Sequence, residues 1–296
     1  MANATRLLVG VERNPHGDEA VRQAGAWAEA HEWELLACHV IEAPVGVATF
    51  PRVAAGADLA RPELVLQVGS TLREQVASLT GRDPARLRVL VETGDPAAEL
   101  VRDAEEERVR LLVVGRHAPA AHLDLTGDVA ERVVRHAHCS VLVARPHRET
   151  KRILVATDLS PAARGALALA ADHARRVDAQ LTLACSVERR MEPVWIMAAF
   201  GATHGFVESE YADVRREVEA QLEAELRAVG ARGDIAVLDG RPAAAIARAA
   251  EERDADLVVL GASGASRLRR ALLGRVAEQV LRAAPCSVLV ARGVSV

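Results

Sequence analysis

Short apolar runs alternate with longer stretches of helical periodicity along the whole chain, and this pattern predicts an α/β protein. In the second half, RILVATD is followed by SPAARGALALAADHARRV, which has helical spacing behind a Ser-Pro start. Ser160 is the expected N-cap of this helix and Pro161 its first residue. The strand-like runs are continuously apolar, as expected for strands that helices cover on both faces.

The alternation continues to the end of the second half. We expect strands at AQLTLACSV, DIAVLD, ADLVVLG and CSVLVAR, and helices at ESEYADVRREVEAQLEAELRAVG, RPAAAIARAAEERD and GRVAEQVLRAA. Strands separated by helices predict a doubly wound parallel sheet. If its five strands take the order 3-2-1-4-5, a ligand crevice lies between the carboxyl ends of the first and fourth strands.

The first half shows the same pattern because the chain repeats itself after 146 or 147 residues. HCSVLVARP returns as PCSVLVARG, and LLVVGRH returns as LVVLGAS. Letter by letter, the equivalent pairs include Glu12 and Asp158, Cys38 and Cys185, and Cys139 and Cys286. A repeat of this length is a whole domain. We therefore predict two tandem domains, residues 1–146 and 151–296.

Composition narrows the function classes. The net charge of -4 provides no basic field for nucleic acid. The start MANATRLLVG has no signal-peptide pattern, and no apolar run is long enough to span a bilayer, so we expect a cytoplasmic protein without membrane contact. The four cysteines lie in apolar runs without CxxC spacing, which favours buried thiols over a zinc site.

Each half carries an irregular insert between its second strand and the next helix, at residues 43–62 and 188–207. These inserts hold Phe50, Trp195, Phe200 and Phe206, although the chain has only three Trp, three Phe and one Tyr. An insert of this kind can be a lid, a partner surface, a weak membrane contact or a loop packed over the sheet. We favour packing, because apolar loop residues usually become buried.

The loop after DLVVL is the strongest candidate for a binding site. It contains Gly261, Gly264 and Gly274, and glycine lets backbone N–H groups approach phosphate oxygens. Gly274 opens a helix whose N-terminus attracts anions. Arg267, Arg269 and Arg270 make the loop basic, and they either contact phosphate or form a solvated face. Other chemistries lack their motifs: GxGxxG after the first strand, GxxxxGK[ST], GxSxG and HExxH are all absent.

The spacing G-x2-G-x9-G, a first strand ending at Asp158, the turn at Gly240 and Pro242, and the closing PCSVLVA strand together resemble the universal stress proteins. The resemblance covers both halves. It implies a stress-response signalling or sensing module that binds ATP, AMP or ADP, with Mg²⁺ left open as a companion ion. It implies no enzyme beyond very slow ATP hydrolysis. A nucleotide-free interaction module of the same fold is the alternative, and an enzyme acting on a phosphorylated substrate is the weakest reading.

The resemblance also assigns residues, none of them catalytic or metal-binding. It places adenosine against Ala156, Thr157, Asp158 and Val187. It places ribose and phosphates against Leu260, Gly261, Ser263, Gly264, Gly274, Arg275 and Val276. It further implies an internal pseudo-dimer through the last strands, at 139–145 and 286–292, and leaves homodimers and protein partners open.

Two departures from the family pattern matter. Arg275 stands where the family has Ser or Thr; it can donate to phosphate as a fork or block the site by its bulk, and we expect binding. The first half keeps Gly115 but has Ala118 for the second glycine, and Asp128 at the helix entrance repels phosphate. With Glu12 in place of Asp as well, we expect the first half to bind nucleotide weakly or not at all.

Overall fold

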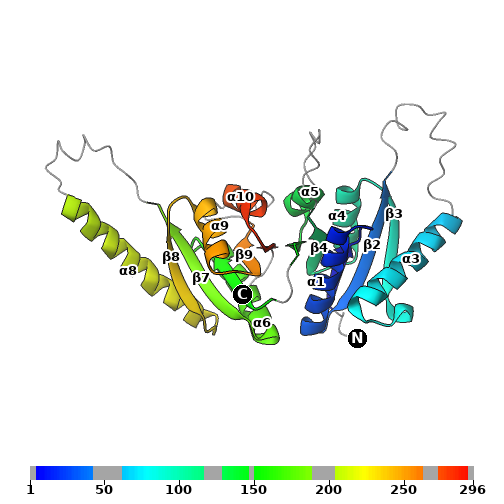
Figure 1. Ribbon diagram of the computed structural model, residues 1–296, viewed down its shortest axis with the longest axis horizontal. Coiled ribbons are helices and arrows are strands. Elements are labelled where there is room, and N and C mark those ends of the chain that lie inside the picture. Colours follow the sequence, from blue (N-terminus) through cyan, green and yellow to red (C-terminus); the bar gives the residue numbers. More distant parts are fainter. Residues whose placement is uncertain are drawn as a thin grey trace, which may run out of the picture. The chain divides into compact units, whose positions relative to one another are not determined.

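The computed structural model describes residues 5–42, 62–116, 129–146, 150–188, 204–262 and 273–292, with the backbone alone at 162 and 204–210. The chain divides into two compact units, which we call unit 1 (Met1–Pro146) and unit 2 (His147–Val296). Each unit alternates strands and helices as the sequence predicts (Figure 1).

The elements of unit 1 are β1 Arg6–Gly10, α1 Pro15–His31, β2 Glu34–Glu42, α3 Pro62–Thr80, a 3-10 turn η2 Pro84–Arg86, β3 Arg88–Gly94, α4 Pro96–Glu106, β4 Leu111–Gly115, α5 Val129–His136 and β5 Ser140–Ala144. Those of unit 2 are β6 Arg152–Ala156, α6 Pro161–Val177, β7 Gln180–Val187, α8 His204–Ala228, β8 Asp234–Asp239, α9 Pro242–Glu252, β9 Leu257–Gly261, α10 Arg275–Ala283 and β10 Ser287–Ala291.

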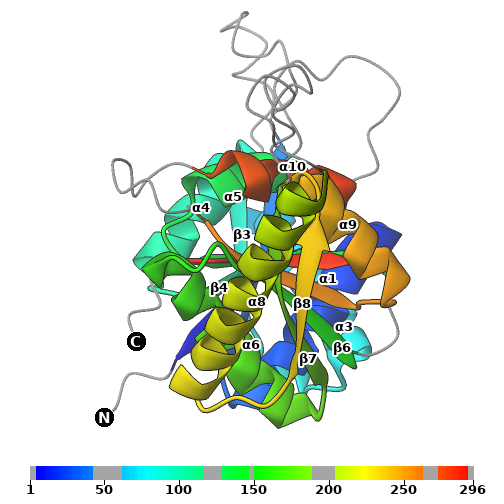
Figure 2. The ribbon, with the colours of Figure 1, turned by 90° about the vertical axis from the view of Figure 1, so that its left-hand side faces the viewer.

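Within each unit the strands are parallel and follow the order 3-2-1-4-5. Unit 1 runs β3-β2-β1-β4-β5, and unit 2 runs β8-β7-β6-β9-β10. Helices α1 and α3 pack together on one face of the first sheet, and α4 and α5 pack together on the other. In unit 2, α8 lies across β8 and β7 (Figure 2), while α9 and α10 pack together. Both sheets are therefore covered on both faces.

The core consists of the central strands, which explains their unbroken apolar sequences. Leu8 and Leu154 in the first strand of each unit are fully buried, and so are Leu112 and Val258 in the fourth strands. A strand covered on both faces has no polar side to alternate with. The predicted start of α6 is confirmed, because the Ser160 side chain accepts a hydrogen bond from the Ala163 N–H and Pro161 follows it.

The strand register corrects one predicted equivalence. Gly10 pairs with Cys38, whereas Ala156 pairs with Ala184, so Cys38 corresponds in space to Ala184 and not to Cys185. The backbone agrees, since the Val11 N–H donates to Cys38 O and the Thr157 N–H donates to Ala184 O. Because successive side chains of a strand point to opposite faces, a one-residue slip puts Cys185 on the face opposite to Cys38.

The inserts also differ from the prediction. Helix α8 begins at His204, so Phe206 belongs to a helix and not to an irregular segment. Phe50, Trp195 and Phe200 lie outside the described residues. Pairing of the two last strands in a pseudo-dimer stays a prediction.

Candidate functional site

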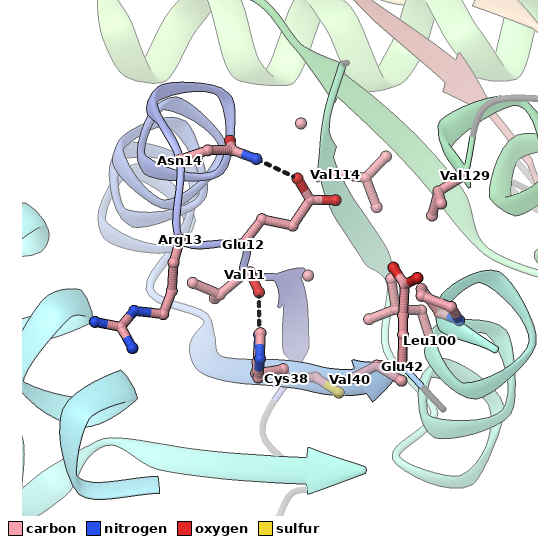
Figure 3. A pocket seen from close by; sticks show the side chains of 14 residues that line it. Val11, Glu12, Arg13, Asn14, Cys38, Val40, Glu42, Leu100, Val114 and Val129 are labelled. Carbon is pink, nitrogen blue, oxygen red and sulfur yellow. Dashed lines mark hydrogen bonds between the residues drawn. The ribbon is translucent and has the colours of Figure 1, made fainter. Parts of the chain in front are cut away.

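Unit 1 contains a cavity of about 250 Å³ at the carboxyl ends of β1, β2 and β4, which is the place where parallel sheets bind ligands (Figure 3). Its apolar walls come from the three strands, from α4 and from the start of α5. The lining residues are Gly10, Val11, Glu12, Arg13, Asn14, Cys38, His39, Val40, Glu42, Pro96, Leu100, Val114, Gly115 and Val129. The sequence did not predict an open site in this half.

Side-chain hydrogen bonds shape the polar wall of this cavity. Asn14 caps α1 by accepting from the Gly17 N–H at 2.9 Å, and its Nδ2 donates to Glu12 Oε2 at 2.8 Å. One amide therefore both starts the helix and orients the Glu12 carboxylate. His39 Nδ1 lies 2.8 Å from Val11 O, and since a carbonyl only accepts, this nitrogen carries the proton.

Cys38, one of the lining residues, forms a buried pair with the carboxyl group of Asp103. Cys38 Sγ donates to Asp103 Oδ2 at 3.3 Å, and Arg102 Nη2 donates to Asp103 Oδ1 at 3.1 Å. Burial raises the pKa of the Cys38 thiol well above its usual range, and the negative charge of Asp103 adds to this shift. Burial likewise raises the pKa of Asp103, while its hydrogen bonds to Cys38 and Arg102 act in the opposite direction. Cys38 is therefore a protonated filler and not a nucleophile.

An ion pair fixes the helices at the rim of unit 1. Asp95 caps α4 by accepting from the Ala98 N–H at 2.9 Å, and both of its oxygens accept from Arg132 on α5, at 2.8 and 2.6 Å. The bonds from Arg132 lower the pKa of Asp95. A lowered pKa means that this contact stabilises the fold above the unfolded-state pKa of the carboxyl and is lost as the pH falls through the folded-state pKa.

In unit 2 the predicted adenosine residues follow β6 directly. Ala156 ends the strand, and Thr157 and Asp158 form a tight turn before α6. Thr157 Oγ1 accepts from the Leu159 N–H at 2.9 Å, and Asp158 Oδ1 accepts from the Ser160 N–H at 3.0 Å. These bonds hold Leu159 at a φ of 61°, in the left-handed region. The turn thus fixes Asp158 at the carboxyl edge of the sheet.

The base of the glycine loop is closed by a backbone hydrogen bond. Leu260 and Gly261 end β9, and the Gly274 N–H donates to Ala262 O at 2.7 Å. Gly274 is the N-cap of α10 and, having no side chain, provides no side-chain bond to the N–H groups of the first turn. Arg275 and Val276 in this turn are exposed. The predicted residues Ser263 and Gly264 lie outside the described residues.

Arg241 is a residue that the sequence analysis missed. It takes the N-cap position of α9, where unit 1 has Asp95, and it makes no side-chain cap bond. Its side chain is exposed. The sequence contained a signal for this residue, because the Gly94-Asp95-Pro96 turn of the first half is repeated as Gly240-Arg241-Pro242, with the charge at the middle position reversed. Helix α9 packs against α10, so this arginine and Arg275 belong to neighbouring helix starts.

Ser186 and Cys185 precede the predicted Val187, and the sequence did not assign either of them to the site. Val187 ends β7, and its carbonyl accepts from the Gly240 N–H at 3.2 Å. Ser186 Oγ donates to Gly240 O at 2.6 Å, which ties β7 to the turn before α9. The Cys185 thiol is half-buried; burial raises its pKa, and the charge of Asp158 adds to the shift. Cys185 is therefore electrostatically coupled to the predicted adenosine residue.

This coupling leads to a labelling prediction. Treated with a maleimide at pH 8, the half-buried Cys139 and Cys185 are expected to react at least about tenfold faster than the buried Cys38 and Cys286. Burial raises the pKa of Cys286 to about 12, which leaves almost no thiolate at pH 8. Peptide mass spectrometry over time gives the four rates. Similar rates for all four cysteines would contradict this prediction.

Two kinds of feature are absent from the part of the chain that the structure describes. No group of three or more His, Cys, Asp or Glu side chains is placed there to hold a metal ion. No helix in that part combines the length and apolar character needed to cross a bilayer.

The model of the universal stress protein family matches the chain twice, over residues 3–145 and 149–292. The chain belongs to this family. The two matches fall in unit 1 and unit 2, so this is a tandem universal stress protein.

Some relatives match nearly the whole chain, and others match about half of it. A universal stress protein of Mycobacterium tuberculosis (strain H37Rv) is 26% identical over 305 residues, covering 97% of this chain and 96% of the relative. One from Methanothermobacter thermautotrophicus is 29% identical over 130 residues, covering 43% of this chain and 87% of the relative. The crystal structure of an Archaeoglobus fulgidus universal stress protein has a TM-score of 0.61 at 19% identity, covering 97% of this chain and 96% of that one. This likeness shows the fold alone.

Proposed function

We propose that this tandem universal stress protein is a stress-response sensing module that binds one adenine nucleotide, ATP, ADP or AMP, in unit 2. The observation that carries the proposal is the closed base of the glycine loop. The bond from Gly274 to Ala262 holds the start of α10 beside the end of β9, and the N-cap residue Gly274 has no side chain with which to cap the helix. A helix start with a glycine N-cap, at the carboxyl edge of a parallel sheet, is suited to phosphate.

The charges around this edge support the same reading. Arg275 stands in the first turn of α10 and Arg241 at the start of α9, and both are exposed. A guanidinium donates two parallel hydrogen bonds to a phosphate, so Arg275 replaces the hydroxyl that the family motif has at this position. Asp158 and Thr157, fixed by the turn after β6, are in place to meet the ribose and base.

We further propose that the protein binds the nucleotide without turning it over at an appreciable rate. A phosphoryl-transfer site needs groups that position the attacking water and stabilise the developing charge. We assign the charged groups described at this edge, Asp158, Arg241 and Arg275, to binding and orientation of the nucleotide and not to activation of a water. Occupancy of the site, and not product formation, is then the signal.

Titration calorimetry with ATP tests the proposal. We expect one ATP per chain in the wild type and loss of binding in Gly264→Asp, because a carboxylate in the loop repels phosphate. The matched control is Ala118→Asp at the twin position of the first half, which is expected to leave the ATP affinity unchanged. No heat with millimolar ATP, together with no adenine nucleotide in the mass spectrum of the purified protein, would leave the nucleotide-free interaction module as the function.

A further inference from the structure

We propose that the cavity of unit 1 is a second ligand site, and that it binds a small organic cation: a primary amine or guanidine on a short apolar stem. The proposal does not depend on nucleotide binding by unit 2. It rests on the size of the cavity, on the charges that line it and on its apolar wall.

The size of the cavity sets the first limit. Pockets for drug-sized ligands have volumes of roughly 300 to 1,000 Å³. At about 250 Å³, the cavity of unit 1 falls below that range. A cavity of this volume accommodates one charged group and a short chain.

The charged groups in the lining favour a cation. The carboxylates of Glu12 and Glu42 both line the cavity, and Asn14 holds Glu12 in position. Arg13 is the one lysine or arginine among the described lining residues, and its guanidinium points away from both carboxylates (Figure 3). Arg13 also lines a separate open hollow against α3, together with Asp18 and Glu74. The cavity itself therefore presents negative charge.

The equivalent site in unit 2 does not have this excess of negative charge. Asp158 and Glu188 correspond to Glu12 and Glu42 by strand register, but exposed Arg241 and Arg275 stand at the helix starts there. In unit 1 the α4 start carries Asp95, whose charge is matched by Arg132. The helix starts of unit 1 thus carry a neutral pair, whereas those of unit 2 carry Arg241 and Arg275, so we expect the two units to suit ligands of opposite sign.

The apolar wall of the cavity is suited to contact the apolar stem of the ligand. Val40, Leu100, Val114 and Val129 line the cavity together with the carboxylates (Figure 3). An amine head between carboxylates forms charge-assisted hydrogen bonds, while methylene groups against valine and leucine leave water. A phosphate or carboxylate in the same place meets like charge.

Calorimetry with agmatine, which carries an amine and a guanidine on a four-carbon stem, tests the proposal. We expect binding by the wild type and at least about tenfold weaker affinity in Glu42→Gln, since each 1.4 kcal/mol is a factor of ten. Glu188→Gln, the same change at the twin position, is expected to bind like the wild type. Val40→Trp fills the cavity without changing charge and is expected to abolish binding, with circular dichroism verifying its fold. Butyrate, an anion with a similar stem, is expected to give no heat.

Three results would overturn the proposal: no heat with millimolar agmatine in the wild type, wild-type affinity in Glu42→Gln, or an equal loss in Glu188→Gln. A titration with ATP in saturating agmatine separates this site from the one in unit 2. Unchanged ATP affinity is expected, because the two ligands occupy different units; competition between them would place agmatine in the nucleotide site and refute the proposal.

Discussion

The Arg241→Asp variant is expected to bind ATP on the order of tenfold more weakly than the wild type, with the loss growing from adenosine to AMP to ATP. Arg241 stands exposed at the start of α9, beside the helix whose N-terminus we assign to phosphate. Reversing its charge makes this edge of unit 2 resemble unit 1, where Asp95 has the same position. Calorimetry with the three ligands measures the trend.

The control is Arg253→Asp, the same charge reversal at the other end of α9. It is expected to change ATP affinity little, because Arg253 is the C-cap that leads towards the start of β9, at the amino edge of the sheet. Raising the salt concentration is expected to narrow the difference between wild type and Arg241→Asp, since screening weakens interactions between exposed charges. If adenosine binding falls as much as ATP binding, the arginine acts on the fold of the turn and not on phosphate.

Leu154→Ala is expected to lower the free energy of unfolding of unit 2 by about 3 kcal/mol, within the range of roughly 2 to 5 kcal/mol for buried leucines. Leu154 lies in β6, the central strand of its sheet, and is 1% exposed. Truncation leaves a cavity that rigid strands on both sides cannot close. Urea denaturation followed by circular dichroism measures the change, and ATP at saturating concentration is expected to restore part of the loss by binding the folded state.

An exposed leucine provides the comparison. Leu66→Ala in α3, where the side chain is 72% exposed, is expected to change stability by no more than about 0.5 kcal/mol. A similar loss in both variants would mean that burial in β6 does not determine the effect.

Much of the fold can be predicted from local sequence patterns. Pro161 behind Ser160 fixes the start of α6, and continuous apolar runs identify the central strands. The duplication adds a second copy of each signal. Helices α1 and α6 have the same length, 17 residues each, and both end at a left-handed residue, Glu32 and Asp178. Local chemistry of this kind needs no knowledge of distant contacts.

The register of β2 and β7 could not be predicted in the same way. Similar letters in LLACHVIE and LTLACSVE suggest that Cys38 matches Cys185, but pairing begins at Glu34 in one unit and at Gln180 in the other. Register depends on which residues each face of the sheet must bury and on the turn before the strand, so similar letters alone do not determine it. This is why His39, and not Cys38, has Cys185 as its counterpart.

The cavity of unit 1 was missed for a related reason. The degenerate glycine loop, together with Glu12 and Asp128, predicted weak or no nucleotide binding in this half, and this prediction concerned no other kind of ligand. The walls of the cavity come instead from residues far apart in the chain, such as Val40, Leu100 and Val114. Their convergence depends on the parallel topology, and the orientation of Glu12 depends on an amide two residues away.

The anchoring of the glycine loop has a consequence for how the two copies diverged. Arg116 and Ala262, which follow β4 and β9, each donate a backbone N–H to the last strand of their unit, to Ala144 and Ala291. These backbone hydrogen bonds do not depend on which side chains the loop residues have. A change of side chains between the anchors of the loop is therefore expected to leave these bonds to the sheet intact. For the same reason, we expect that residues 263–273 can replace the equivalent loop of unit 1 while the backbone bonds at its ends are kept.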